Sequence, residues 1–387
     1  MPPQQQPQQP AGYMQPQVPA ALMGQQQGSA PQQGMMGFPP QQQQQQVPQS
    51  GSRGPSAYGQ GMPSQQQPPQ QRQHQRVICV GDLHGNVTEL RRLFESLEAR
   101  LGASSLADAS VVFLGDYCDR GPCTREVFDW LIDFRDRRRA GGGQGRTCFL
   151  AGNHDMGMAA YLGCLPTAES ASFFEHLGQV WGRSDNYYEA ASCFASYGCT
   201  FGGQNPAKER ASFVAAVPKA HKRFLRDLDW VVDWAVPWQP GRLVCVHAGL
   251  HRSRSCEEQI EALKARDFTA TVLHDPKKKN RLVPLQSRED VEDAPSSLHA
   301  VLVSGHHGKR VISGNRIIMD LGGGRPTAQE PLQAIILPEH TIVGSDDPVE
   351  AGAFAAAPFA AAPQQQPVPY EALYEEAKAG QWAHVLQ

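Results

Sequence analysis

Short apolar runs alternate with helix-like stretches near the start of the ordered-looking part of this sequence. A strand-like run is followed by a helical pattern that begins after Asn86, a suitable N-cap, and ends at Gly102. The segments follow in the order strand 77–80, helix 87–101, strand 111–114, helix 122–139 and strand 147–150. Such alternation is typical of parallel strands joined by crossover helices. We therefore predict an α/β fold with a binding site at the carboxyl ends of its strands.

Each of these strands, and two later apolar runs, ends in acidic, amide or imidazole side chains. A single Asp-x-His after a strand is weak evidence, because Asp and Gly favour turns. Several such clusters at equivalent places are hard to explain in that way, and we expect them to meet at one edge of a sheet. The clusters are GDLHG at 81–85, GDYCDRG at 115–121, GNHD at 152–155, HAG at 247–249 and GHH at 305–307.

The side chains in these clusters predict a metal centre. Carboxylate, amide oxygen and imidazole ligands suit Mn²⁺, Fe or Zn²⁺. The sequence has no cluster of cysteines, which argues against a structural zinc site. The number of candidate ligands fits two ions that share one carboxylate. Two ions roughly 3.5–4 Å apart can hold a bridging hydroxide and clamp a phosphoryl group during in-line displacement. We therefore expect Asp116 to pair with metal and Arg120 with the phosphate of a substrate.

The motifs, in this order, resemble the signature set of the phosphoprotein phosphatase (PPP) group of the calcineurin-like metallophosphoesterases, over most of residues 76–338. GDYCDRGP, AGNHD, VHAGL and SGHHGK are closer to the Rhizobiales-like phosphatases of plants and algae. The resemblance implies a calcineurin-like β-sandwich with flanking helices and a helical cap insertion. It also implies hydrolysis of protein phosphomonoesters by direct attack of a metal-bridging hydroxide. The late Ser-Ala-Pro-Asn-Tyr segment of the mainstream Ser/Thr enzymes has no counterpart here.

The resemblance assigns a role to each matching residue. His154 would be the general acid that protonates the leaving oxygen, and Asp119 would orient and charge it. Arg120 would bind phosphate oxygens with its planar fork, next to Asn153. The metal ligands would be Asp82 and His84 at the first ion, Asp116 between the ions, and Asn153, His247 and His306 at the second.

Several neighbouring residues have two possible roles. Asp155 either belongs to the site or only caps the following helix, and His307 either faces the substrate or packs. His299 is expected at the surface. The family usually has a second basic phosphate contact between the HAG and GHH motifs. The candidates are Arg252, Arg266, Lys277, Arg281 and Arg288.

A long insertion at about 156–240 separates the third motif from the fourth. Its segments 170–182 and 218–234 have helical patterns. A segment that leaves the carboxyl end of a strand rises over the active edge, so we expect a cap that selects substrates. One basic stretch would either contact an acidic or second phosphorylated residue or form a solvated helix face. It consists of Lys219, His221, Lys222 and Arg223.

Composition divides the chain into three parts. Residues 1–74 are rich in Gln and Pro and contain no acidic residue, which predicts a disordered leader that either contacts other proteins or is inert. The catalytic domain would span 75–345, and 346–387 would be an Ala/Pro/Gln-rich tail with a possible short helix. The net charge of -3 provides no basic surface for nucleic acid. No apolar run is long enough to span a membrane.

Cysteine usage bears on location and on chemistry. The chain has nine cysteines and no secretory signal, which predicts reduced thiols in a protein of the cytoplasm, or of the cytoplasm and the nucleus. None has an arginine six positions downstream, so a thiolate-loop phosphatase is excluded. The Rhizobiales-like resemblance implies a phosphorylated protein substrate and a preference for phosphotyrosine. The alternatives are a Ser/Thr-directed phosphatase, a small-molecule phosphohydrolase such as a dinucleoside polyphosphate hydrolase, and an interaction protein with a vestigial catalytic block.

Overall fold

The computed structural model describes residues 75–165, 171–183, 188–251, 254–267, 272–273, 281–282 and 297–349. The predicted leader 1–74 and the tail beyond 349 lie outside the described residues, so those expectations remain predictions. All predicted metal ligands lie inside them.

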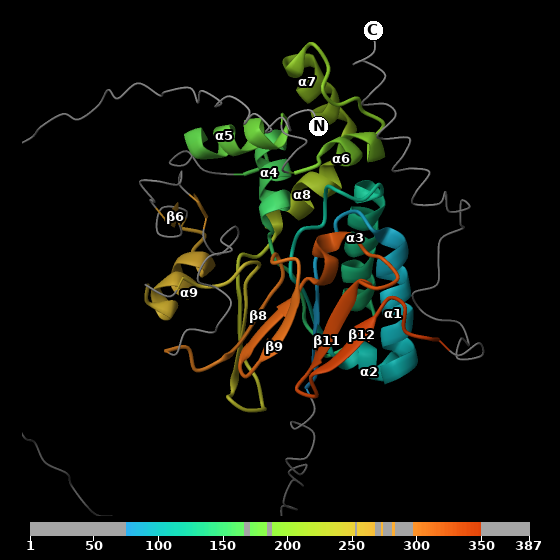
Figure 1. Ribbon diagram of the computed structural model, residues 1–387, viewed down its shortest axis with the longest axis vertical. Coiled ribbons are helices and arrows are strands. Elements are labelled where there is room, and N and C mark those ends of the chain that lie inside the picture. Colours follow the sequence, from blue (N-terminus) through green and yellow to red (C-terminus); the bar gives the residue numbers. More distant parts are fainter. Residues whose placement is uncertain are drawn as a thin grey trace, which may run out of the picture. The chain divides into compact units, whose positions relative to one another are not determined.

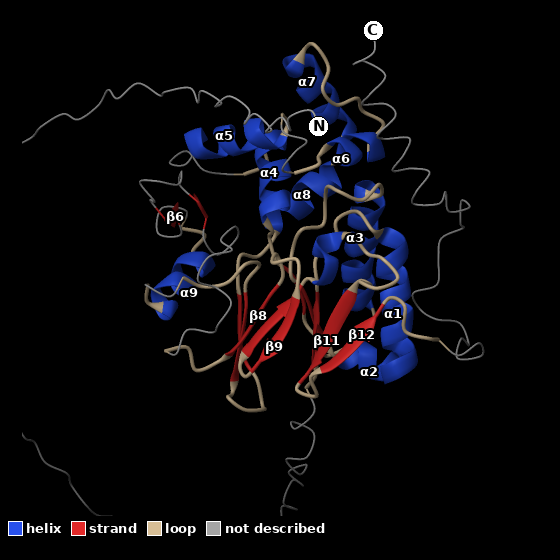
Figure 2. Ribbon diagram, viewed as in Figure 1, coloured by secondary structure: helices blue, strands red, loops and turns tan. Residues whose placement is uncertain are grey.

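Two five-stranded sheets form the centre of the fold (Figures 1 and 2). The first has the strand order β12-β11-β1-β2-β3 and the second β4-β5-β8-β10-β9. The first sheet contains β1 (Val77–Val80), β2 (Ser110–Phe113), β3 (Thr147–Phe149), β11 (Gln333–Leu337) and β12 (Thr341–Gly344). The second contains β4 (Val232–Ala235), β5 (Arg242–Cys245), β8 (Val301–Ser304), β9 (Arg310–Ser313) and β10 (Arg316–Met319). A separate pair joins β6 (Val272–Leu273) to β7 (Arg281–Leu282).

Strand directions follow the motifs. β1, β2 and β3 are parallel to one another, as are β5, β8 and β10, while β4, β9, β11 and β12 pair antiparallel. The prediction that all five motifs meet at the edge of a single sheet is therefore wrong in one respect. Three motifs follow strands of the first sheet and two follow strands of the second, and the sandwich brings both sets of strand ends together.

Alternate side chains of β1 show why both faces of the first sheet are buried. Cys79 packs between the sheets, in a cluster with Val112, Leu243 and Val303. Ile78 belongs to the cluster on the opposite face, where the helices pack. Successive residues of a strand point to opposite faces, so an uninterrupted apolar run such as VICV fits a strand covered on both sides.

Helices cover the outer faces of the sandwich. α1 (Val87–Leu101), α2 (Ala103–Asp108) and α3 (Thr124–Ala140) lie beside the first sheet, and α9 (Cys256–Lys264) lies on the side of the second (Figure 1). Phe94 of α1 and Phe134 of α3 both pack on Phe113 of β2, with ring centroids 5.9 and 5.6 Å away. The helices expected at 87–101 and 122–139 are confirmed, although α3 begins two residues later than predicted.

The insertion forms a helical layer beyond one end of the sheets, at the top of Figure 1. α4 (Asn153–Leu162) begins in the third motif and leads into the insertion, which also contains α5 (Ala171–Trp181), α6 (Ala191–Ser196), α7 (Pro206–Ala216) and α8 (Lys219–Asp227). The expected helix 170–182 corresponds to α5. The expected helix 218–234 is wrong beyond Asp227, because residues 232–235 form β4 and pair with β5. Ladder hydrogen bonds to the next strand along the chain, β5, override the local helical pattern there.

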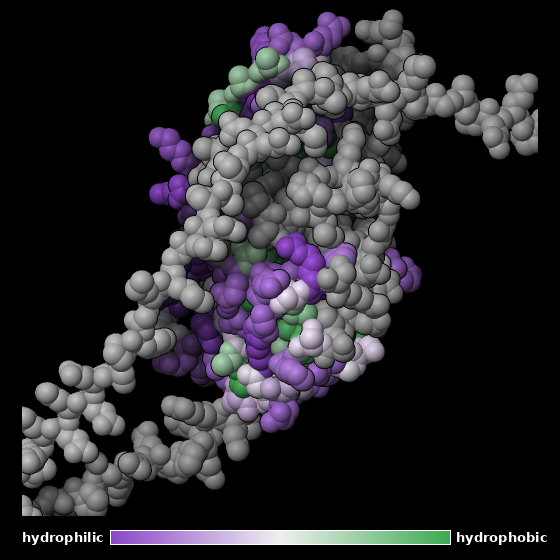
Figure 3. Space-filling view, turned by 90° about the vertical axis from the view of Figure 1, so that its left-hand side faces the viewer, coloured by the Kyte–Doolittle hydropathy of each residue, from purple (hydrophilic) through white to green (hydrophobic). Residues whose placement is uncertain are grey.

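The described surface is mostly polar. Hydrophilic side chains predominate in the described part of the face shown in Figure 3. Among the described residues, the one exposed large hydrophobic side chain is Ile312, on the edge strand β9, with 42% of its surface accessible. Within the same residues, no helix combines the length and the apolar character that crossing a membrane requires.

Candidate metal centre

The loops that follow the strands place several site residues in strained backbone conformations. φ is positive at five of them, although none is glycine. They are His84 (41°), Asp116 (54°), Asp119 (69°), Arg120 (61°) and His306 (69°). Such conformations are costly for non-glycine residues and persist only where the surroundings hold them, often at functional sites. Here the backbone amides of Leu83 and His84 both donate to the carbonyl of Asp116, at 3.0 and 2.8 Å.

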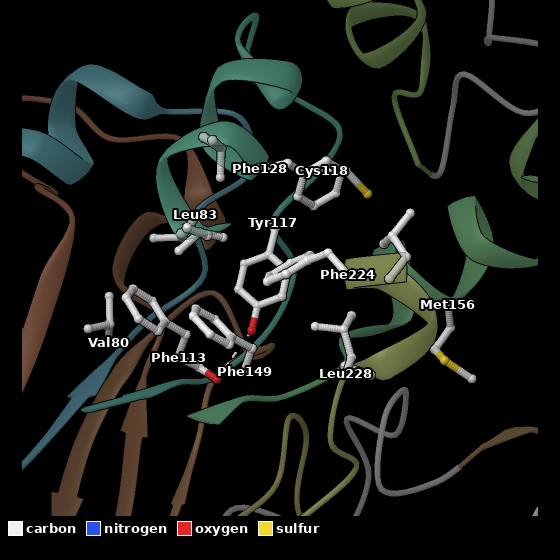
Figure 4. Close-up of a cluster of buried hydrophobic side chains, with 14 of the residues drawn as sticks. Val80, Leu83, Phe113, Tyr117, Cys118, Phe128, Phe149, Met156, Phe224 and Leu228 are labelled. Atoms are coloured by element: carbon white, nitrogen blue, oxygen red, sulfur yellow. Dashed lines mark hydrogen bonds between the residues drawn. The ribbon is translucent and has the colours of Figure 1, made fainter. Parts of the chain in front are cut away.

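Tyr117 anchors the charged loop VFLGDYCDRGP in the core. Its ring lies among aromatic side chains (Figure 4), with its centroid 5.7 Å from that of Phe224. Its hydroxyl donates a 2.8 Å hydrogen bond to the carbonyl of Leu150. The side chain of Tyr117 therefore points into the core, while its charged neighbours Asp116 and Arg120 contact the histidines of the site.

Two groups of buried side chains share Asp116. His84, Asp116 and His154 form one, and Asp116, His247 and His306 form the other. Within each group the potential ligand atoms all lie within 4.8 Å of one another. Oδ2 of Asp116 lies 3.5 Å from Nε2 of His84 and 3.3 Å from Nε2 of His247. This carboxylate therefore stands between the two groups.

Asp82 and Asn153 lie at the edges of these groups. Oδ2 of Asp82 accepts a 3.1 Å hydrogen bond from the backbone amide of His306 and lies 4.0 Å from Nε2 of His84. Oδ1 of Asn153 lies 3.2 Å from Nε2 of His247. The structure thus brings every predicted metal ligand into one buried region.

The tautomers of two histidines leave ligand atoms facing this region. Nδ1–H of His84 donates to the carbonyl of Cys118 at 2.8 Å, and Nδ1–H of His247 donates to the carbonyl of Leu114 at 2.7 Å. A carbonyl only accepts, so Nδ1 carries a proton in each ring, and Nε2 is the nitrogen that faces the site. Metal-binding histidines characteristically use their second nitrogen in this way. Both imidazoles are therefore oriented as a divalent cation requires.

Electrostatics also fit a cation. Burial, together with the neighbouring Asp320, raises the pKa of Asp82 well above its usual range. Burial would also raise the pKa of Asp116, but the imidazoles of His247 and His154 hold it well below its usual range. Burial and the nearby guanidinium of Arg120 lower the pKa of His84. Burial would lower the pKa of His247, but the neighbouring carboxylates of Asp116 and Asp82 raise it to about 10. Carboxylates and imidazoles are the donors expected for divalent Mn, Fe or Zn.

His154 has a different partner from the other histidines. Its Nδ1–H donates a 2.8 Å hydrogen bond to Oδ2 of Asp119, a buried carboxylate. Its Nε2 lies 3.3 Å from a terminal nitrogen of Arg120. The other terminal nitrogen of Arg120 lies 2.8 Å from Nε2 of His84 and also donates to the carbonyl of Gly323. Arg120 thus stands between His84 and His154.

Asp155 has both of the roles considered for it. Its Oδ2 accepts hydrogen bonds from the amides of Gly152, at the start of α4, and of Asp116. Its Oδ1 accepts one from the amide of Tyr117. Burial and the charge of Asp116 raise its pKa to about 7. Asp155 therefore caps α4 and also holds the loop that carries Asp116.

Sequence reasoning missed Asp320. This residue follows β10 and is buried, and its Oδ2 accepts a 2.6 Å hydrogen bond from the amide of Gly308. Burial raises its pKa to about 6. The run RIIM before Asp320 and the glycines after it repeat the strand-then-acid pattern of the other motifs, so the signal was present.

Other candidates have structural roles. The guanidinium of Arg266 donates to carbonyls at the end of α8, including a 2.7 Å hydrogen bond to that of Leu228. His307 donates to the carbonyl of Ala248 at 2.7 Å, which is a packing role, and His299 is exposed as predicted. Arg252, Lys277, Arg288 and the side chain of Arg281 lie outside the described residues.

The basic stretch of α8 is mainly structural as well. His221 is buried and hydrogen-bonded to Tyr197 and Asp129, and Lys222 donates to the carbonyl of Val214. These contacts contradict a substrate role for both residues. Lys219 and Arg223 are exposed, as a solvated helix face requires.

A cavity of about 450 Å³ lies away from these residues, beside the start of β3. Arg135, Arg138, Arg146 and Trp234 are among its lining residues. None of the predicted site residues lines this cavity. The size of a cavity therefore does not identify the candidate metal centre in this protein.

Comparison with known proteins decides the family. Residues 75–322 match the calcineurin-like phosphoesterases. The chain belongs to this family. The predicted α/β sandwich is thereby confirmed, and so is the expectation of a metal-dependent phosphoester hydrolase. The matched region contains every predicted metal ligand.

Individual relatives are distant. The serine/threonine-protein phosphatase PP1-1 of Saccharomyces cerevisiae is 26% identical over 163 residues, which cover 40% of this chain and 48% of that protein. The match therefore spans about half of the relative's length. It supports the similarity to PPP phosphatases, while the Rhizobiales-like assignment stays a prediction.

Two solved structures resemble the chain in fold. A cold-active protein-tyrosine phosphatase of a psychrophilic Shewanella is 12% identical, with a TM-score of 0.40, over 69% of this chain and 76% of that one. A metallophosphoesterase from Sphaerobacter thermophilus is 14% identical, with a TM-score of 0.32, over 70% and 86%.

Proposed function

We propose that this protein is a dinuclear-metal protein phosphatase of the Rhizobiales-like type, which hydrolyses phosphomonoesters of proteins and prefers phosphotyrosine. The observation that carries the proposal is the pair of buried groups that share Asp116, next to the hydrogen-bonded pair of His154 and Asp119. A shared carboxylate suits two cations, and a histidine held by a carboxylate suits proton transfer.

The first cation would be held by Asp82, His84 and Asp116, and the second by Asp116, Asn153, His247 and His306. When bound, the two ions would lower the pKa of water and neutralise the charge of the phosphoryl group. Mn²⁺, Fe and Zn²⁺ all accept these nitrogen and oxygen ligands.

Arg120 would bind the phosphate. Its terminal nitrogens already lie among the histidines of the site, and its buried Nε–H has no hydrogen-bond partner among the described residues. A planar guanidinium can offer two parallel donors to phosphate oxygens. Asn153 would add a contact from the start of α4.

His154 would supply the proton for the leaving group. Its Nδ1–H is held by Asp119, so Nε2 is the nitrogen that faces the site. As the bond between phosphorus and the leaving oxygen breaks, the proton on Nε2 would move to that oxygen. The buried carboxylate of Asp119 would stabilise the imidazolium before transfer.

The proposed preference for phosphotyrosine rests on the resemblance of the motifs, and one buried aromatic side chain lies beside the proposed general acid. Tyr188, from the insertion, lies with its ring centroid 5.0 Å from that of His154. A phenolate of pKa about 10 also leaves more easily than an alkoxide, so selectivity would come from ring binding. The similarity to PP1-1 favours a second candidate, a Ser/Thr-directed phosphatase.

We also propose a reducing compartment, the cytoplasm or the nucleus, as the site of action. All nine cysteines are free thiols, which supports this. The partners would be phosphorylated proteins, with further protein contacts through the Gln-rich leader.

The test is turnover by the full chain loaded with Mn²⁺. Three substrates are compared: a phosphotyrosine peptide, the same peptide with phosphoserine, and diadenosine tetraphosphate. We expect the highest kcat/KM on phosphotyrosine and none in Asp116→Asn. Preference for phosphoserine would replace the tyrosine assignment, preference for the tetraphosphate would overturn the protein phosphatase, and no turnover with metal bound would indicate a vestigial site.

A further inference from the structure

Trp181 lies at the centre of a contact between the insertion and the catalytic histidine. It is the last residue of α5, and its side chain is fully buried. Its Nε1–H donates a 2.8 Å hydrogen bond to Oδ2 of Asp119. The same oxygen accepts the 2.8 Å hydrogen bond from Nδ1–H of His154. One carboxylate oxygen therefore joins the insertion to His154.

The other oxygen of this carboxylate is not held in the same way. Among the described residues, Oδ1 of Asp119 is buried without a hydrogen-bond partner. The orientation of the carboxylate therefore depends on the two donors that meet at Oδ2. Of these two donors, His154 is the group that must be oriented for proton transfer. The indole of Trp181 is therefore the donor that fixes the orientation of the carboxylate.

The indole is held rigidly by the rest of the insertion. Its ring centroid lies 5.2 Å from that of Tyr161 on α4, 5.6 Å from that of Phe194 on α6 and 5.8 Å from that of Phe213 on α7. Aromatic groups packed at these distances restrict one another strongly. The direction of Nε1–H is therefore set by three separate helices.

Helix α4 is shaped to receive this indole. It carries His154 in its first turn and Gly157 three residues later, on the same side of the helix. A Cβ at Gly157 would lie 2.7 Å from Cδ1 of Trp181, which is too close for a real side chain. The glycine therefore lets the ring lie against α4 beside His154.

We propose that Trp181 is a positioning residue, through which the helical insertion fixes the Asp119–His154 pair in the orientation needed for proton donation. This rests on the proposed function, in which His154 is the general acid. Without the indole N–H, the carboxylate would turn more freely, and Nε2 of His154 would spend less time directed at the leaving oxygen. Metal binding would be unaffected, because in the described part of the chain no hydrogen bond or ring contact joins the indole to a predicted ligand.

The kinetic test is Trp181→Phe in the full chain, which keeps an aromatic ring and removes the donor. Trp130→Phe is the matched control, because Trp130 is buried on α3 and stacks on Phe134 at 5.0 Å. Both are assayed with phenyl phosphate, whose leaving group needs a proton, and with 4-nitrophenyl phosphate, whose leaving group departs as a stable anion.

We expect Trp181→Phe to lower kcat about tenfold on phenyl phosphate and less than about threefold on 4-nitrophenyl phosphate, with KM and metal content unchanged. A tenfold loss is a fraction of the roughly 10²–10⁴-fold that a general acid contributes. Trp130→Phe should lower both rates equally or not at all. Equal losses on both substrates in Trp181→Phe, or loss of metal, would mean that the indole is only structural.

A second measurement needs no turnover. ¹H–¹⁵N spectra are recorded for the full chain with ¹⁵N-labelled tryptophan, and the indole resonance of Trp181 is the one that is missing from Trp181→Phe. This resonance should lie downfield in the wild type and should move upfield in Asp119→Ala. An unmoved resonance in Asp119→Ala would overturn the proposal. If Trp181→Phe fails to fold, the indole resonance of Trp181 is assigned by selective hydrogen exchange instead. Its shift in Asp119→Ala still decides between the two outcomes. If the wild type shows no phosphatase activity, the spectra separate failure of the proposed function from failure of this contact.

Discussion

Oδ2 of Asp116 lies 3.3 Å from Nε2 of His247, with both side chains buried. The same oxygen lies 3.5 Å from Nε2 of His84, which belongs to the other candidate ligand group. A carboxylate placed in this way acts on both groups at once, whereas each histidine acts on one. Substitutions should therefore differ in how many ions they remove.

Asp116→Asn should bind fewer than one ion per chain, while His306→Asn should keep about one of the two expected. The reason is that His306 belongs to one group and Asp116 to both. Metal content is measured by mass spectrometry of dialysed protein. Asp108→Asn, at an exposed position, should keep the full content. Two ions in Asp116→Asn would show that Asp116 is not shared.

His154→Asn should keep its metal and lose turnover. Removing the proton donor should lower kcat roughly 10²–10⁴-fold on phenyl phosphate, the usual range for general acid catalysis. The loss should be much smaller on 4-nitrophenyl phosphate. The exposed variant His299→Asn is the control. Loss of an ion in His154→Asn would instead make His154 a ligand, which its place in the group of His84 and Asp116 allows.

Arg120→Lys should weaken phosphate binding although the charge is retained. Lysine cannot offer two parallel donors, and its single nitrogen cannot span His84 and His154 as the two terminal nitrogens of Arg120 do. Losing one hydrogen bond to a charged group costs about 1.5–3 kcal/mol, so kcat/KM should fall on the order of 10–100-fold. The exposed variant Arg223→Lys should leave kcat/KM unchanged. Inorganic phosphate inhibition should weaken in parallel, and unchanged inhibition would contradict the role of Arg120.

The grouping of the candidate metal ligands was predictable because each of them has a local signal in the sequence. Asp82, Asp116 and His247 each lie two or three residues after the end of a strand, and strand ends converge by the geometry of the fold. The division of those strands between two sheets was not predictable in this way. β5, for example, pairs with β8 in the second sheet, where Leu243 lies opposite Val301, and not with a strand of the first sheet.

Residues that act from the insertion had weaker signals. Trp181 reaches Asp119 across 62 positions, and no repeat or spacing links them. The burial of His221 could have been predicted from its spacing. Phe224 and Leu225, three and four residues later, mark the buried face of α8. The basic neighbours of His221 suggested a solvated face, but the helical period places it with the core.

His221 should make stability depend on pH. It is 1% exposed; its Nε2–H donates to Asp129 at 2.8 Å, and its Nδ1 accepts from the hydroxyl of Tyr197 at 2.8 Å. Burial lowers its pKa, although Asp129 opposes the shift. In the unfolded chain the pKa of histidine is about 6.5. As the pH falls below that value, the unfolded state takes up the proton first, so the free energy of unfolding should decrease.

The comparison with His221→Gln isolates this effect, because glutamine does not titrate and other groups cancel in the difference. Above about pH 7 the wild type should be more stable by roughly 1–3 kcal/mol, because the variant leaves the hydroxyl of the buried Tyr197 without its partner. The difference should shrink as the pH falls from 7 towards 5, since only the wild type has a proton to take up on unfolding. Urea unfolding at several pH values measures it. A difference that stays constant would show that folding does not lower the pKa of His221, and one that grows towards pH 5 would show that His221 is protonated in the folded protein and paired with Asp129 as an ion.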